Sequence, residues 1–169
     1  VYAKPVYFTH RASSWGYATW KDRWDQVDWC VTDYPSFRRS WAARARFNRG
    51  GRDMAPMLDR QMEGAIDSWA IRWCYAQSKL DALTVYPLHS LVQNIGLDGS
   101  GTHSGTASQF SAEVGQAPLK AGLCDPFLDK RALKSVRNMY GTMPQHLRAS
   151  AGRRARKVIS YASERRDER

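Results

Sequence analysis

Two aspartates are the residues of this chain best suited to acid–base chemistry. Asp67 stands at the start of a predicted helix, five residues before Arg72, and Asp53 follows the glycine pair Gly50 and Gly51. A carboxylate at a helix start normally caps the helix and interacts with its dipole, which stabilises it by about 1 kcal/mol. A carboxylate can also take the proton of a hydroxyl, and such a positioned base contributes about 10²–10⁴-fold to a rate. The residues alone favour capping for Asp67 and a solvated helix–helix turn around Asp53.

Tryptophans beside small and polar residues suggest a carbohydrate site. Trp15 and Trp20 flank Gly16, and Trp69 follows Asp67 by two residues. The apolar face of a hexose packs on an indole ring, and a glycine lets a ligand approach the backbone. The alternative is a tryptophan-rich core helix, which is favoured for Trp24 and weighs equally with ligand binding for Trp15.

A glycine-rich string later in the chain could meet phosphates. Backbone N–H groups around Gly99 and Gly101 could cradle a diphosphate, although glycine-rich loops are common. His103 follows directly and could bind a metal, but composition alone favours an exposed histidine. His89, between two predicted strands, is expected to be structural.

Taken in order, residues 13–20, 66–73 and 94–103 resemble the C-terminal half of family 2, GT-A-type glycosyltransferases that build bacterial surface polysaccharides. The similarity runs from about Val6 to His103. It implies transfer of a sugar from a nucleotide-sugar donor to a hydroxyl of a glycan or lipid-linked acceptor such as lipopolysaccharide. Asp67 would be the general base, and Asp53 would contact the acceptor or act as a second carboxylate.

The resemblance also implies the rest of the site. Substrate would be bound by Trp15, Gly16, Trp20, Gly50, Gly51, Trp69, Arg72, Gly99 and Gly101. His103 would lie near a divalent cation, Mn²⁺ or Mg²⁺, and the donor diphosphate. Two departures stand out: Ile66 replaces the first acid of the usual pair, and the chain has no Asp-x-Asp motif. We therefore expect the acceptor side of the enzyme here, as a fragment, as a truncated product or as one half of a split enzyme whose N-terminal half is a separate partner.

Apolar spacing predicts a mostly helical chain with a few strands. Helices are expected over residues 18–28, from 34 to a stop at 48–51, over 55–63 and 67–79, and after Asp125-Pro126; strands over 84–87 and 90–93; and a loop over 97–117. In the second helix Phe37, Trp41 and Ala45 would share one face. The fold class is α/β, as the C-terminal portion of a GT-A domain that lacks most of the nucleotide-binding sheet. Residues 1–125 would form the acceptor-side part, and 126–169 a helical basic extension.

Composition limits the other possibilities. The chain has 169 residues and a net charge of +10, and no apolar run approaches the roughly 20 residues of a membrane span. Cys30, Cys74 and Cys124 are scattered and fit a reducing cytoplasm better than a disulfide framework. The basic stretch 148–169 would hold the enzyme on anionic inner-membrane lipid. The alternatives are a non-catalytic remnant or interaction domain and a basic nucleic-acid-binding module, although the tryptophans lie in helical apolar registers.

Overall fold

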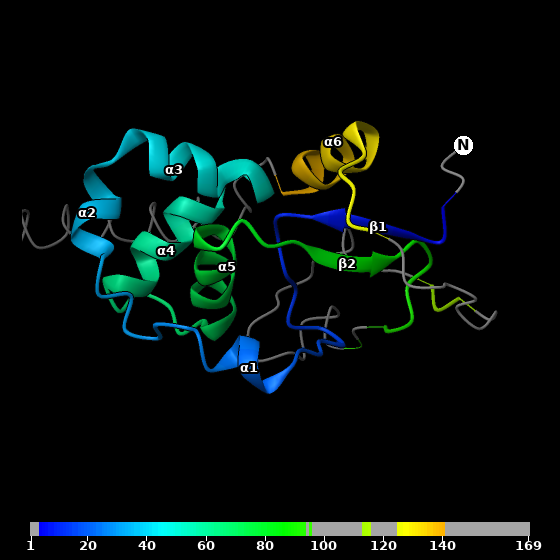
Figure 1. Ribbon diagram of the computed structural model, residues 1–169, viewed down its shortest axis with the longest axis horizontal. Coiled ribbons are helices and arrows are strands. Elements are labelled where there is room, and N and C mark those ends of the chain that lie inside the picture. The colour runs from blue at the N-terminus through cyan, green and yellow to red at the C-terminus, as the bar shows by residue number, and fades with distance from the viewer. Residues whose placement is uncertain (1–3, 94, 96–112, 116–124, 141–169) are drawn as a thin grey trace, which may run out of the picture.

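The computed structural model describes residues 4–93, 95, 113–115 and 125–140 (Figure 1). Its elements are β1 (Val6–Thr9), α1 (Lys21–Trp24), α2 (Tyr34–Arg39), α3 (Trp41–Phe47), the 3₁₀ turn η1 (Asn48–Gly50), α4 (Met54–Met62), α5 (Trp69–Lys79), β2 (Thr84–Pro87) and α6 (Lys130–Met139). Helices α2 to α5 gather at one end, and the two strands lie at the other with α6 above them (Figure 1).

The two strands form one antiparallel pair. Tyr7 lies opposite Tyr86, and their rings stack with centroids 5.4 Å apart. The prediction of β2 is confirmed, whereas β1 was not predicted. The strand predicted over 90–93 is wrong. There the Ser90 hydroxyl accepts from the amide of Val92 and donates to its carbonyl, and such local bonds compete with strand pairing.

Helices α2 and α3 replace the single helix predicted from residue 34. Ser40 between them has an extended backbone, and its hydroxyl accepts from the amide of Ala43, which caps α3. The break redirects the chain, so that Phe37 is buried while Trp41 is 83% exposed. The predicted common face of Phe37, Trp41 and Ala45 is therefore wrong. Helix α1 is likewise much shorter than the predicted 18–28.

The core lies between α4 and α5, and both predicted helices are confirmed. Met54, Ala55 and Leu58 of α4 are fully buried, and Ile71 and Cys74 of α5 pack in the same cluster. Three rings complete it in edge-to-face contacts, those of Phe37, Phe47 and Tyr75.

Helix α6 begins later than predicted. Its cap is Asp129, whose carboxylate accepts from the amides of Arg131 and Ala132, so Asp125-Pro126 does not open the helix. Val136 is its buried residue, and the helix contacts β1 and η1. Among the described helices, none is both long and apolar enough to cross a membrane.

Other predictions reach beyond this part of the chain. Cys30 and Cys74 are free thiols, exposed and buried respectively. Cys124, most of the loop over 97–117 and the basic stretch 148–169 lie outside the described residues.

Candidate functional site

Five aromatic rings join the first two sequence blocks. Tyr17 lies edge-on to Trp69 and Trp73, with ring centroids 5.6 and 5.5 Å away. Trp24 of α1 lies 5.7 Å from Trp69, 5.8 Å from Trp73 and 4.4 Å from Trp29. We call these five residues the aromatic cluster. It packs the chain that follows β1, together with α1, against the first two turns of α5.

The aromatic cluster is only half closed. Trp24 and Trp69 are 39% and 37% exposed, and Trp15 and Trp20 beside them in sequence are 41% and 76% exposed. Trp20 precedes α1 by one residue, and its carbonyl accepts the amide of Trp24. The exposed area of these four indoles is available for stacking on the apolar face of a sugar.

Asp67 lies at the exposed start of α5. The N-cap is the next residue, Ser68, and no side-chain cap hydrogen bond is made there. Its amide donates instead to the side chain of Gln61, at 2.5 Å. Among the described residues the carboxylate of Asp67 has no hydrogen bond or ion pair. The residues alone favoured helix capping for Asp67, and the carboxylate does not cap α5.

Arg72 ties α5 to the loop before α2. Its Nη1 donates to the carbonyl of Trp29 at 3.2 Å, while its Nε is buried and has no hydrogen-bond partner in the described part of the chain. The guanidinium therefore positions Trp29, and the N–H at its Nε remains an unused donor.

Asp53 has a different environment, because it is buried in an ion pair. Its two oxygens accept from Arg11 at 2.8 and 3.0 Å, and the guanidinium lies 3.7 Å from the ring centroid of Tyr140. Burial by itself lowers the pKa of Arg11, but the charge and hydrogen bonds of Asp53 outweigh it, and the net pKa is raised. Arg11 thus stays charged, and both oxygens of Asp53 are occupied.

The glycine pair serves this ion pair. A Cβ at Gly51 would lie 2.6 Å from Oδ1 of Asp53 and 2.9 Å from Nη1 of Arg11. A Cβ at Gly50 would lie 2.9 Å from the carbonyl of His10. Both glycines are buried, so they let the chain after η1 pass close to the residues that follow β1.

Gly16 brings a third segment near the first block. It has φ +61°, and a Cβ there would lie 2.6 Å from Cγ1 of Val92. The chain that leads toward residues 94–103 therefore passes against the first block. Gly99, Gly101 and His103 themselves lie outside the described residues, and His89 is exposed.

The expected divalent cation finds no site in the described segments. They contain no group of three or more His, Cys, Asp or Glu side chains able to hold a metal ion. A cavity of about 460 Å³ lies between α6 and the sheet and is lined by Tyr7, Leu88, Arg131, Ala132, Ser135, Val136 and Met139. None of the predicted site residues lines it.

Two residues that organise the site escaped the sequence reasoning. Arg11 belongs to no motif, and nothing in the sequence marks it as the partner of Asp53. Tyr17 lies inside the first block and contacts α5 through Trp69 and Trp73. The carbohydrate hypothesis was based on the neighbouring tryptophans instead. The position of Tyr17 between Gly16 and Trp20 was the available signal.

No family model, curated protein or solved structure matches this chain.

Proposed function

We propose that this chain is the acceptor-side part of a family 2, GT-A-type glycosyltransferase, which moves a sugar from a nucleotide-activated donor to a hydroxyl of a glycan acceptor. The supporting observation is the contact between two blocks far apart in sequence. Tyr17 of the first block packs on Trp69 and Trp73 of the second, and the unengaged carboxylate of Asp67 lies two residues before Trp69.

The exposed indoles are the proposed acceptor platform. A pyranose ring has an apolar C–H face and a rim of hydroxyls, so it can stack on an indole while polar groups meet the rim. Among Trp15, Trp20, Trp24 and Trp69, Trp20 is the most exposed. Trp69 is held in place by its ring contacts with Tyr17 and Trp24.

Asp67 is the proposed base, and Asp53 is not. A base needs a free oxygen within reach of the acceptor hydroxyl. Asp67 accepts the hydroxyl proton as the hydroxyl oxygen bonds to the anomeric carbon, and the bond from that carbon to the nucleotide diphosphate breaks with its electron pair. Asp53 cannot do this without giving up Arg11.

The donor nucleotide is the leaving group of this step, and no part of the step is routed through the divalent cation. The resemblance implies both, but the described residues provide no site that fits a metal. The chemistry derived from this chain is therefore acceptor binding and proton removal.

The test is sugar transfer by the purified full chain and its Asp67→Asn variant. Radiolabelled UDP-, GDP- and dTDP-hexoses are offered with Mn²⁺ and lipopolysaccharide as acceptor. We expect Asp67→Asn to lower transfer by about 10²-fold or more, because the amide cannot take the proton. Glu63→Gln, a change at an exposed acid just past α4, is the matched control and should retain activity.

One result would contradict the assignment of the base, and another would show that the acceptor-side part needs a further component for transfer. Full activity in Asp67→Asn would remove Asp67 as the base. No transfer from any donor by the wild-type chain would show that the chain by itself is not the enzyme.

A further inference from the structure

Several elements along one long edge of the molecule contain cations and no acids within their bounds. Helices α2 and α3, the turn η1 and helix α6 follow each other along this edge (Figure 1), and η1 contacts both α3 and α6. None of these elements contains Asp or Glu. Arg44 pairs with Asp59, and Arg46 and Arg49 share Asp81. Within these four elements, the described cations without an ion pair are Arg38, Arg39, Lys130, Arg131, Lys134 and Arg137, and we call them the basic edge.

An unsupported tryptophan lies among these cations. Trp41 is the first residue of α3, comes just after Arg38 and Arg39, and is 83% exposed. Within the described part of the chain its indole makes no hydrogen bond, ring stacking or cation contact. Ala42 and Ala45 of the same helix are also exposed. Leaving so much apolar area in water is unfavourable, and nothing in the fold requires it.

We infer that the basic edge binds the surface of a bilayer containing anionic lipid, with Trp41 inserted at the level of the headgroups. Anionic headgroups attract each nearby Lys or Arg, and tryptophan prefers this interface because one part of the ring is apolar and its N–H is polar. Exposed alanines beside Trp41 let the helix approach closely. The pattern is that of a peripheral attachment site, in which apolar and cationic side chains share one surface.

Nucleic acid fits this edge less well. Binding to a single strand normally uses several exposed aromatic rings in series, on which successive bases stack. The other aromatic side chains of α2 and α3 turn inward. Phe37 and Phe47 are buried, and the hydroxyl of Tyr34 donates to Asp59. A single protruding indole suits a shallow interface.

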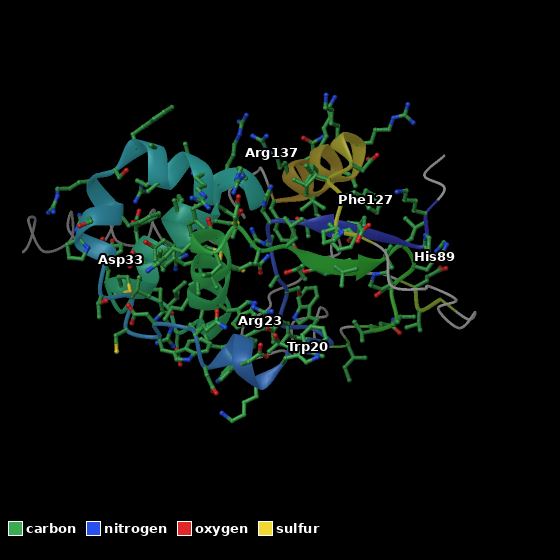
Figure 2. The ribbon with its side chains drawn as sticks, viewed as in Figure 1. Trp20, Arg23, Asp33, His89, Phe127 and Arg137 are labelled. Atoms are coloured by element: carbon green, nitrogen blue, oxygen red, sulfur yellow. The ribbon has the colours of Figure 1, made fainter. Side chains whose placement is uncertain are left out.

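The inference does not depend on the proposed sugar transfer. Figure 2 shows Trp20 and Arg23 by α1 at one edge of the molecule and Arg137 by α6 at the other. A chain lying on a bilayer through the basic edge would leave α1 and the aromatic cluster facing the water. Failure of one proposal would therefore leave the other standing.

The experiment is vesicle co-sedimentation of the full chain. Phosphatidylcholine vesicles are compared with vesicles containing about one third phosphatidylglycerol, at low salt and at about 0.5 M NaCl. We expect binding only to the anionic vesicles and its loss at high salt. The double variant Arg38→Gln/Arg39→Gln should weaken partitioning by on the order of 10-fold, and Trp41→Ala should weaken it as well.

Matched controls come from the opposite edge. Lys21→Gln/Arg23→Gln removes the same net charge from α1, and Trp20→Ala removes another strongly exposed indole. Both should bind vesicles like the wild type. Equal binding by the Arg38/Arg39 variant and its α1 control would overturn the inference, and so would stronger binding of a DNA duplex than of vesicles through the same arginines.

Discussion

Two aspartates with similar sequence settings have opposite environments. Asp53 precedes α4 and Asp67 precedes α5, and neither side chain caps its helix. Asp53 is 7% exposed and bound by Arg11, whereas Asp67 is exposed and free of partners among the described residues. A buried carboxylate that accepts two hydrogen bonds from an arginine stabilises the fold, whereas an exposed carboxylate without partners remains available for proton transfer. The difference comes from Arg11, which the sequence does not connect to either aspartate.

The structural role assigned to Asp53 predicts a large loss of stability in Asp53→Asn. The amide leaves the charged Arg11 buried without a counter-ion, which costs about 3–5 kcal/mol. Urea unfolding followed by circular dichroism measures this change. Asp22→Asn breaks an ion pair with Arg23 in which both side chains are more than half exposed, so its midpoint should stay unchanged. An Asp53→Asn protein as stable as the wild type would contradict the structural role.

At the scale of elements, the turn after η1 depends on glycine at one position. Gly51 has φ +154°, and a Cβ there would collide with both partners of the Arg11–Asp53 pair. We expect Gly51→Ala to disrupt the ion pair and to destabilise the fold more than Gly64→Ala. Gly64 has φ +69° but nothing within 4 Å of its Cβ position, so an alanine there costs only backbone strain, about 1–2 kcal/mol.

Thermal unfolding of the two variants measures the difference. Equal decreases in the melting temperature of the two variants would show that the Arg11 and Asp53 side chains can move aside for a Cβ at Gly51.

The start of α6 gives a second prediction at this scale. Asp129 satisfies two amides of the first turn, so Asp129→Ala should weaken the helix by about 1 kcal/mol. Asp125→Ala should have no effect, although Asp125-Pro126 looked like the helix start in the sequence. Amide hydrogen exchange in α6 distinguishes them, and faster exchange in the Asp125 variant would restore the sequence-based interpretation.

The helices with a long apolar face were predictable, whereas of the short elements only β2 was found at its predicted place. Residues of α4 and α5 repeat apolar side chains at helical spacing over two or more turns, and both helices were found close to their predicted limits. Helices α2 and α3 differ from the prediction because one hydroxyl, that of Ser40, caps a new helix inside a continuous pattern. Strand β1 was missed because its partner lies far along the chain, and pairing over such a distance leaves no local signal.

At the scale of the whole molecule, folding disfavours the charged form of His10. Burial lowers the pKa of His10, and the charges of Arg49 and Arg46 lower it further, against an opposing effect of Asp81. The unfolded chain binds the proton of His10 more readily than the folded chain does. The contribution of neutral His10 to the free energy of unfolding is therefore complete above about pH 6.5 and is lost as the pH falls toward the lowered pKa. The free energy of unfolding should therefore decrease between pH 7 and pH 5.

His10→Gln should reduce that decrease. Urea unfolding at both pH values measures it for each protein. The same pH dependence in the variant and the wild type would contradict the assignment to His10.

The site was predictable as a set of segments but not as a geometry. The resemblance grouped residues 13–20 with 66–73, and Tyr17 contacts Trp69 and Trp73. The resemblance could not show that Gly50 and Gly51 pack against the chain after β1. Nor could it show that Arg11 forms an ion pair with Asp53, because these contacts join residues about forty positions apart. Long-range pairing of charges depends on the folded chain, whereas motifs report only local order.

The most direct test of the central claim is sugar binding through the open side of the aromatic cluster. Saturation-transfer NMR with lipopolysaccharide-core oligosaccharides compares the wild type with Trp20→Ala and Trp41→Ala. These variants remove indoles that are 76% and 83% exposed, one beside the aromatic cluster and one on the basic edge. We predict signal transfer to the sugar in the wild type and in Trp41→Ala, and its loss in Trp20→Ala. No transfer in the wild type, or transfer unaffected by Trp20→Ala, would contradict an acceptor site at these tryptophans.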